Sequence, residues 1–541
     1  MLNFTTAATM RGVSRTPFSD FLIYVGLSLI AFGIVKLAVL IPIWGINSPE
    51  ALLWVMIAVF TALTVSVRAS DLPPGTAMIL RIMYAGFAIY LAFSLTLPDD
   101  AGFGFLTDLR LRNRQFFLPI LCVLGFWRPT FGVVAMMGAI CERNTLGAWF
   151  GNSLSQTEFF TIVEVCVFLL IAAALLPIAK IWLGLSQVEQ PFGASDRLST
   201  MTKMTLLAIC VHLSNYFYSG FAKIFIGTYP LSWMIANHTE NMILVHNEYR
   251  QLPLSLISGL PQLAFDGFQY VVIALNATTF LGQLFALVAP LRIRWVVIVT
   301  AFYDVMHLII FFVSGIFFYK WILLNIAIVV ALRHSLKEKI DHRVKLMSVG
   351  MVILAPVLFN VANLAWFDIR TLNHERIYAV LDDKTEIEVP SNYWGTFSIH
   401  YAQQRRLPKF SGNLFPPRYG KTQKQSAAEA ADGCQTALAP ADSASQPLPD
   451  PGVVEHILGH HQYVLSHLDA AGRIDYDFYP HHIWSMPWEY LTFRDLDKRR
   501  IRAYRIEVEA VCLGIDNGDF TRKVVRSKSY VIPLPGKLDT L

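Results

Sequence analysis

The sequence has few charged side chains for its length. Only 15% of its 541 residues are Asp, Glu, Lys or Arg, whereas 54% are hydrophobic. A soluble domain carries roughly a quarter charged residues. The charges are sparse up to residue 330 and become common after residue 366. This composition excludes a chain that is soluble throughout, and it predicts a membrane part followed by a water-facing part.

Cysteine is also scarce. Six cysteines are present, and their spacing matches no metal site, so we expect no bound metal. Four lie in or near apolar runs, where a free thiol behaves as a small apolar residue: Cys122, Cys141, Cys166 and Cys210. Cys434 and Cys512 lie in the C-terminal part and can pair if it faces an oxidising compartment, and the sequence leaves both states open. Basic and aromatic residues form no common patch, so nucleic acid is not an expected partner.

What the sequence does contain is long apolar runs. A helix needs ~20 apolar residues to cross the hydrocarbon of a bilayer. Such runs occupy 21–43, 51–67, 77–96, 116–141, 159–183, 203–226, 268–291, 295–317, 319–333 and 344–365. Several are interrupted, and we therefore expect about nine spans. The first run is too long for the apolar part of a cleaved signal peptide, so we interpret it as a permanent span.

Internal breaks divide some of these runs. Arg128-Pro129 interrupts the fourth run and predicts a bent helix or a re-entrant segment. The stretch 295–332 fits either a tight hairpin or one kinked helix. Residues 227–249, which include Tyr229 and Trp233, fit an amphipathic interfacial or re-entrant segment, because such aromatic side chains suit the headgroup zone.

Positive charge in short loops predicts the orientation. The loops 333–345 and 110–114 are both basic and should be cytoplasmic. The last span then delivers the C-terminal region to the extracytoplasmic side of a cell membrane. Arg11 and Arg15 favour a cytoplasmic N-terminus, which requires an odd number of spans. The shortest early run, 51–67, is therefore the candidate that does not span.

The C-terminal part changes to alternating, β-type patterns. Residues 376–401 contain Asp382-Asp383 between two β-rich runs and predict a hairpin. Two further strands are predicted around Asn517-Gly518-Asp519. The fold class is thus an α-helical polytopic membrane bundle followed by a β-containing extracytoplasmic domain. Its expected parts are an N-terminal segment 1–20, a transmembrane domain 21–365, a β-rich segment 366–422, a flexible linker 423–452 rich in Ala, Ser, Gln and Pro, and a β-containing segment 453–541.

The run 203–226 carries a polar stripe. At 100° per residue, one helix face holds His212, Tyr216, Ser219 and Lys223. Such a stripe must face the bundle interior or a cavity, because lipid cannot satisfy it. Two interpretations of Lys223 stay open. In the first, its aliphatic side chain extends to the membrane interface and places the ammonium group there. In the second, Lys223 is a desolvated amine that acts as a base.

A second polar pair lies in the run 295–317. Asp304 and His307 are three residues apart and share a helix face at a depth where ionisable groups are costly. They either satisfy each other and lock two helices together, or they are functional. Lys36, Arg81 and Glu164 are further charges within spans, and we expect them to pair structurally across helices.

Histidines crowd the C-terminal part. His456 and His460 are four residues apart, but Gly459 weakens a helix there and no third metal ligand is clearly placed. We therefore interpret this group as surface residues: His456, His460, His461, His467, His481 and His482.

Two stretches carry a resemblance to a known family. "YFYSGFAKIFIGTYPLSW" resembles the signature of the horizontally transferred transmembrane (HTTM) domain, with Gly220, Lys223 and Trp233 at its pattern positions. Vitamin K-dependent gamma-carboxylases share this domain. "MHLIIFFVSGIFFYKWIL" resembles a later helix of the family through His307, Gly315 and Phe317. The resemblance covers roughly residues 15–400, and a multi-span core followed by a β-containing domain also fits it.

The resemblance implies a reaction. In the gamma-carboxylases, the lysine that matches Lys223 is assigned as the base that starts oxygenation of a reduced, vitamin K-like quinone. The strong base formed there removes a γ-proton from a peptide glutamate, and CO₂ adds. This chain has Ala222-Lys223 where the carboxylases carry two lysines, and "FLPILCVLGFWRPTFGVV" where they carry a His-containing segment.

Two hypotheses follow for the function. In the first, the protein is a quinol-linked, carboxylase-type enzyme with Lys223, His307 and Asp304 as catalytic residues and a cavity that holds Lys223 and His307 together. Its cofactor-binding residues would be His212, Tyr216 and Trp233. In the second, the protein is a non-catalytic membrane protein that binds a peptide or protein partner or assists its export, and Lys223 faces lipid headgroups. Membrane lipid is a partner in both.

Overall fold

The computed structural model describes residues 15–41, 50–92, 116–149, 157–190, 198–397, 423, 426–427, 451–474, 483–484 and 486–535. Several predictions therefore concern residues outside this part of the chain. They are the basic loop 110–114, Arg11, nearly all of the linker 423–452, Cys434, His481, His482 and the side chain of His456.

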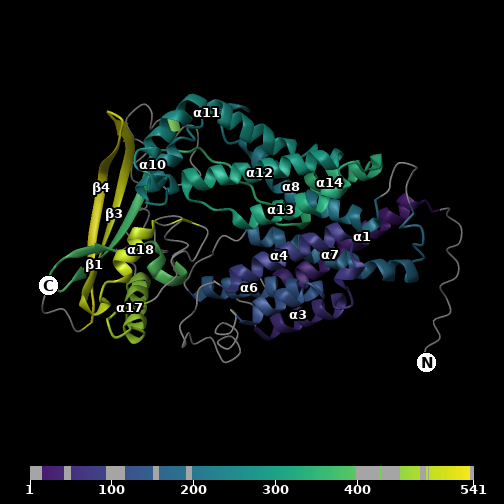
Figure 1. Cartoon of the computed structure of the whole chain (residues 1–541), viewed down its shortest axis with the longest axis horizontal. Helices are drawn as coiled ribbons and strands as arrows, with labels where there is room; N and C mark the ends of the chain where they lie inside the picture. Colours follow the sequence, from purple (N-terminus) through teal and green to yellow (C-terminus); the bar gives the residue numbers. More distant parts are fainter. Residues whose placement is uncertain are drawn as a thin grey trace.

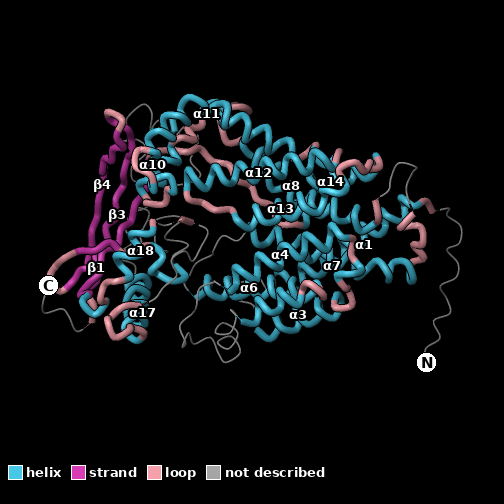
Figure 2. Tube along the Cα trace, in the orientation of Figure 1, coloured by secondary structure: helices cyan, strands magenta, loops and turns pink. Residues whose placement is uncertain are grey.

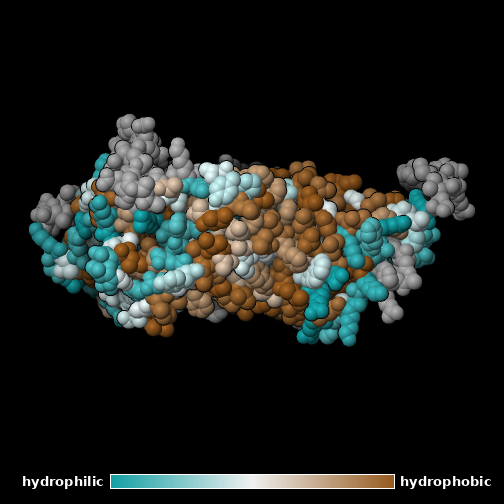
Figure 3. All heavy atoms as spheres, turned by 90° about the horizontal axis from the view of Figure 1, so that it is seen from above, coloured by the Kyte–Doolittle hydropathy of each residue, from teal (hydrophilic) through white to brown (hydrophobic). Residues whose placement is uncertain are grey.

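The molecule is a long helical bundle with a β-sheet at one end. In Figure 1 the helices run along the long axis and the sheet stands across it, and Figure 2 shows the strands gathered at that end alone. On the face seen from above, a broad hydrophobic band covers the middle of the molecule between two more hydrophilic ends (Figure 3). This distribution fits a bundle embedded in a bilayer with polar material on both sides.

Helices occupy all ten apolar runs. They are α1 (Pro17–Val35), continued by the π-helix η1 (Lys36–Leu40), α3 (Glu50–Thr64), α4 (Pro74–Ala92), α6 (Pro129–Trp149), α7 (Thr157–Trp182), α8 (Thr200–Lys223), α11 (Leu260–Phe285), α12 (Ile293–Ser314), α13 (Tyr319–Leu332) and α14 (His342–Leu358). Two short helices, α9 (Ser232–Ala236) and α10 (Asn241–Glu248), follow α8. Within the described residues, five helical segments are long and apolar enough to cross a membrane: Pro17–Leu40, Pro74–Ala92, Phe160–Trp182, Leu260–Phe285 and Ile293–Ser314.

The breaks within the apolar runs have local causes. The fourth run turns at residues 125–128, and Pro129 then opens α6, where its missing N–H has no helical partner to lose. The stretch 295–332 forms two helices that separate at Gly315. This glycine has φ of +67°, and a side chain there would collide with the Gln251 carbonyl. Of the two forms open for this stretch, the hairpin of α12 and α13 is the observed one.

The predicted run 344–365 is helical over only part of its length. The helix α14 ends at Leu358, and residues 359–370 continue as an extended segment through the bundle. Extended backbone at this depth needs partners inside the protein, and the neighbouring helices provide them. Glu164 Oε2 accepts from Asn360 N (2.6 Å), Asn215 Oδ1 from Ala362 N (2.7 Å) and Ser219 Oγ from Leu364 N (3.1 Å). The hydropathy of this stretch resembles a span, and these side-chain acceptors explain why it is not helical.

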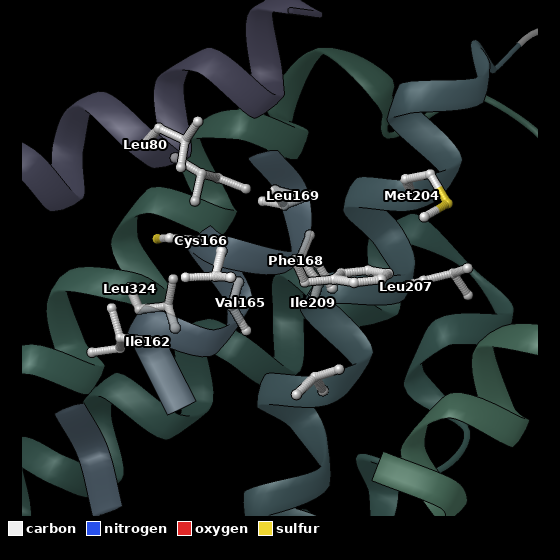
Figure 4. Packing of buried hydrophobic residues seen from close by; sticks show 14 of the residues in the cluster. Leu80, Ile162, Val165, Cys166, Phe168, Leu169, Met204, Leu207, Ile209 and Leu324 are labelled. Carbon is white, nitrogen blue, oxygen red and sulfur yellow. The ribbon is translucent and has the colours of Figure 1, made fainter. Parts of the chain in front are cut away.

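The core of the bundle is centred on α7 and α8. Figure 4 shows Phe168 and Leu169 of α7 packed near Leu207 and Ile209 of α8, and all four are buried. Among the charges predicted within spans, Lys36 Nζ and Glu164 Oε1 form an ion pair at 2.9 Å. In the described part of the chain, Arg81 forms no ion pair, and its guanidinium donates to the carbonyl oxygen of Phe126.

The sheet joins the two predicted β-segments. Its order is β2 (Glu386–Glu388), β1 (Thr371–Leu381), β3 (Ile501–Asp516), β4 (Asp519–Pro533), with all neighbours antiparallel. Both predicted hairpins are present. The β3–β4 turn places Asn517 and Gly518 at φ of +53° and +87°, a pair of left-handed residues that suits a tight hairpin. Since β1 pairs with β3 along its length, the segments on either side of the linker share one sheet.

Helices α17 (Pro451–Ser466) and α18 (Pro487–Arg494) pack on this sheet. The helix α17 forms despite Gly459. The interpretation of its histidines as surface residues is wrong for His461, which is buried and lies 3.0 Å from the Tyr504 hydroxyl. Within the described residues, no group of three or more His, Cys, Asp or Glu side chains is placed to hold a metal ion. Cys512 on β3 is disulfide-bonded, whereas Cys122, Cys166 and Cys210 are free and buried.

Candidate functional site

A cavity of about 200 Å³ lies between α8, α11, α12 and α13, and the extended segment 359–370 closes one wall. Its lining is mostly apolar and aromatic, with a few polar side chains among them. The polar and aromatic members are Tyr216, Ser219, Lys223, Trp233, Thr239, Phe268, Asn276, Thr278, Thr279, Gln283, Phe302, His307, Phe318, Trp321, Trp366 and Asp368. A largely apolar pocket with a few convergent polar groups is the usual form of a small-molecule site.

Lys223, the last residue of α8, is buried at this cavity. Its side chain is 6% exposed, and Nζ donates to the carbonyl oxygens of Ser219 (3.1 Å) and Leu364 (2.8 Å). The Trp233 ring centroid lies 4.9 Å from Nζ. Carbonyl dipoles and the face of an indole both favour an ammonium ion and offset part of its desolvation cost. The side chain of Lys223 therefore points into the protein and not out to its surface.

The extended segment 359–370 brings to the cavity a carboxylate that the sequence analysis missed. Asp368 lies beyond α14 on the extended segment, and its side chain accepts hydrogen bonds from Asn237 Nδ2 and Trp366 Nε1, both at 2.9 Å. Burial raises the pKa of Asp368 to about 6, although these hydrogen bonds and the charge of Lys223 oppose the shift. Asp368 lies ten residues after the end of α14, outside any helix, so helical periodicity could not assign it to a face. The extended backbone of residues 359–370 brings it to the cavity.

His307 of α12 also lines the cavity. It is 2% exposed, and its ring centroid lies 5.0 Å from that of Phe318 and 5.7 Å from that of Trp321. The side chain of Asp304 is half-buried, does not line the cavity and accepts from Asn325 Nδ2 at 2.8 Å. No hydrogen bond joins Asp304 to His307 among the described residues, so the first of the two open interpretations, a pair that satisfies itself, is not observed.

Asn325 of α13 links the remaining polar groups behind the cavity. Its Oδ1 accepts from His212 Nε2 at 2.8 Å, and its Nδ2 donates to Asp304 Oδ1 and to the Tyr216 hydroxyl at 3.2 Å. Tyr216 in turn stacks on Tyr303 with ring centroids 3.6 Å apart. Sequence reasoning overlooked Asn325, although an amide in the middle of an apolar helix is a recognisable signal of interhelical hydrogen bonding.

Three buried polar atoms of the cavity-lining residues have no hydrogen-bond partner among the described residues. They are His307 Nδ1, Gln283 Oε1 and Trp321 Nε1. Leaving such an atom unsatisfied costs about 1–3 kcal/mol. A small molecule in the cavity with both donor and acceptor groups would satisfy all three atoms.

The structure thus brings four of the predicted site residues, Lys223, His307, Tyr216 and Trp233, to one cavity. The other two, His212 and Asp304, lie behind it and connect to Tyr216 through Asn325. The lining therefore combines an amine, an imidazole and a phenol within an apolar enclosure. Such groups can bind a planar molecule that carries polar substituents at its edge, and they can transfer protons to or from those substituents.

Comparison of the chain with models of protein families, with curated proteins and with solved structures finds no match in any of the three. The similarity to the HTTM domain therefore stays a hypothesis that rests on the residues quoted above.

Proposed function

We propose that this protein is a multi-pass membrane enzyme of the HTTM type that couples oxidation of a reduced quinone to a carboxylase-type reaction, with Lys223 as the base. The observation that carries the proposal is the burial of Lys223 at an apolar cavity that it shares with His307. A desolvated amine beside an imidazole is suited to proton removal in a water-poor site.

The lining fits the ring of a reduced quinone. Tyr216, Phe318 and Trp321 supply aromatic surfaces for a flat ring. The unpartnered atoms His307 Nδ1, Gln283 Oε1 and Trp321 Nε1 offer acceptors and a donor for its oxygen atoms. When bound, the quinol would supply the reducing electrons of the reaction.

The chain's own groups then have distinct tasks. Lys223 Nζ takes a proton from a bound hydroxyl, and the Ser219 and Leu364 carbonyls hold it in place. Asp368 stabilises the ammonium ion that results, since a nearby carboxylate favours the charged form of an amine. His307 stabilises an oxygen atom of the ring, and Asn325 fixes the phenol of Tyr216 from behind.

We also propose a membrane topology. The chain crosses the membrane nine times, α3 does not cross it, and the sheet lies on the extracytoplasmic side. Support comes from the basic stretch 333–345, which precedes α14 at the end of the bundle away from the sheet (Figure 1). The disulfide at Cys512 agrees with an oxidising compartment. Membrane-impermeant labelling of an introduced cysteine on β4 tests this placement, and labelling only from the cytoplasmic side would contradict it.

Lys223→Arg tests the base. Arginine keeps the positive charge but does not release its proton at working pH. We expect oxygen uptake driven by a reduced quinone, measured in nanodiscs, to fall by about 10²-fold or more. Lys320→Arg is the matched control, because Lys320 is equally buried and does not line the cavity. Full activity of Lys223→Arg would exclude base catalysis by this residue.

One observation favours the alternative, a non-catalytic protein that binds or helps to export a peptide or protein. Through Leu364, Lys223 also fixes the extended segment that leads into β1. In that case wild-type protein shows no quinol-driven oxygen uptake, and Lys223→Met lowers the thermal stability without loss of any turnover.

A further inference from the structure

The end of the bundle away from the sheet carries an excess of positive charge. The stretch 333–345, which joins α13 to α14, contains five basic side chains: Arg333, Lys337, Lys339, Arg343 and Lys345. Its acidic residues are Glu338 and Asp341, and the Asp341 carboxylate already accepts from the Arg343 backbone N–H at the start of α14 (2.8 Å). Within the described residues, none of the five basic side chains forms an ion pair. Their charge is therefore available to an anionic partner.

Arg343 stands where α14 meets α1. Its guanidinium lies 4.9 Å from the centre of the Phe18 ring in the first turn of α1, and it forms no hydrogen bond within the described part of the chain. At the other end of the two helices, a Leu358 methyl group lies 3.4 Å from the place of a Cβ on Gly33. The two contacts are 15 residues apart on both helices, so α1 and α14 run side by side in the same direction.

Between these two contacts the facing side chains are apolar and poorly covered. At 100° per residue, Leu22 lies on the face of α1 that holds Phe18, and Leu354 lies on the face of α14 that holds Arg343. Leu22 is 50% exposed and Leu354 is 63% exposed, whereas side chains between closely packed helices are buried. An apolar strip, defined by Leu22 and Leu354, therefore extends from Arg343 along a segment that can cross a membrane.

A second guanidinium lies at the same end of α1. Arg15, two residues before the helix begins, is exposed, and its Nη1 donates to the carbonyl oxygen of Leu183 just beyond α7 (3.1 Å). Since a guanidinium has five N–H donors, this single bond leaves Arg15 able to bind a further acceptor. Trp182, the last residue of α7, is 82% exposed, and an indole in that position suits the headgroup zone of a bilayer.

We infer that this end of the bundle binds one anionic phospholipid, whose phosphate lies at Arg343 and Arg15 and whose acyl chain lies along the strip of Leu22 and Leu354. Guanidinium groups bind phosphate through paired N–H donors. A zwitterionic lipid also brings its own cation to the same place, whereas the net negative charge of an anionic lipid complements the basic stretch. The inference does not depend on the reaction proposed above.

Lipid selectivity tests the headgroup contact. Native mass spectrometry of the full chain in detergent compares phosphatidylglycerol with phosphatidylcholine of the same acyl chains. We expect wild-type protein to bind phosphatidylglycerol about tenfold more tightly, and Arg343→Gln to bind the two lipids within about twofold of each other. Lys345→Gln is the matched control, because it removes the same charge from the opposite face of the same helix and should keep the selectivity.

Photochemical crosslinking tests the acyl chain without relying on a change of charge. A benzophenone side chain at Leu354 should crosslink to phosphatidylglycerol that stays bound in detergent, and Arg343→Gln in the same chain should abolish the product. The same group at Ile353 is the control, since Ile353 is 44% exposed at nearly the same depth but points about 100° away.

The two measurements can overturn the inference separately from the proposed function. If wild-type protein binds both lipids equally, no anionic lipid site exists. If Arg343→Gln and Lys345→Gln lower the selectivity equally, the attraction comes from the diffuse charge of the stretch, and the specific site is wrong. Equal crosslinking from Leu354 and Ile353 would exclude the strip as the place of the acyl chain.

Discussion

The two ends of α8 are buried against different kinds of neighbour, and their side chains differ accordingly. Its first turns contribute Met204, Leu207 and Ile209 to the apolar core. Its last turns contribute Asn215 and Ser219, which accept hydrogen bonds from the extended segment 359–370. A neighbouring helix satisfies its own backbone, whereas extended backbone does not. Part of the polar stripe on α8 is therefore explained by its neighbour, whose extended backbone needs hydrogen-bond acceptors. Substitutions at the two ends of α8 should differ in cost for this reason.

The largest effect is expected at the ion pair beside the extended segment. Glu164→Leu leaves the Lys36 ammonium without its carboxylate and Asn360 N without its acceptor. Breaking a buried pair in this way costs about 3–5 kcal/mol. Stability measured by SDS titration should fall by that amount, and Lys36→Met in the same chain should restore part of it. No recovery in the double variant would show that the backbone contact, and not the charge, dominates.

The next effect concerns the junction of the bundle with the sheet, where water has access. Glu248 of α10 contacts His374, Arg376 and Arg522 on the sheet at 2.7–2.9 Å. Burial opposes ionisation, but the hydrogen bond and charge of His374 and the charges of the two arginines lower the pKa of Glu248 to about 2. A carboxyl whose pKa is lowered on folding stabilises the protein above its ordinary pKa of about 4.5, and this contribution is lost as the pH falls towards 2.

The acid-sensitive contribution at Glu248 should amount to roughly 3 kcal/mol. We expect detachment of the sheet, followed by hydrogen exchange in β1 and β3, between pH 4.5 and about 2. In Glu248→Gln the exchange should be faster at neutral pH and vary less across this window. An unchanged pH profile in that variant would assign the acid sensitivity to other groups.

A smaller effect is expected at Asn215. The substitution Asn215→Leu removes the acceptor for Ala362 N inside the bundle and should cost about 1–3 kcal/mol. Increased protease or hydrogen-exchange sensitivity should appear first in residues 359–370. If exchange in this segment does not change, its backbone has another support and the comparison of the two ends of α8 is wrong.

The smallest effect is expected at the other end of the same helix. Thr205 shares a hydrogen bond of 2.6 Å with Thr76 of α4, between two regular helices. Thr205→Val should cost about 1 kcal/mol or less in the same SDS titration, because the Met201 carbonyl, which also accepts from Thr205 Oγ1, keeps its helical N–H partner. If Thr205→Val lowers the stability as much as Asn215→Leu does, packing against a helix and packing against extended backbone do not differ in the way described here.

Periodicity predicted much of the fold and part of the site. The 3.6-residue repeat placed His212, Tyr216, Ser219 and Lys223 on one face, and all four are buried in the structure. It did not predict where the helix after residue 342 ends, since the apolar residues of 359–367 satisfy a hydropathy window in either conformation. Asp368 was missed for the same reason. Asn325 has no periodic repeat either, and only its place inside an apolar helix could have signalled it.

The extended segment also has a mechanical consequence. An extended chain rises about 3.3 Å per residue, which is close to the maximum, so it cannot lengthen much further. Residues 359–370 are fixed to α7 and α8 at one end and run directly into β1 at the other. A displacement of the sheet along this line would therefore load the hydrogen bonds of Leu364 and Asp368, and it would reach the wall of the cavity directly.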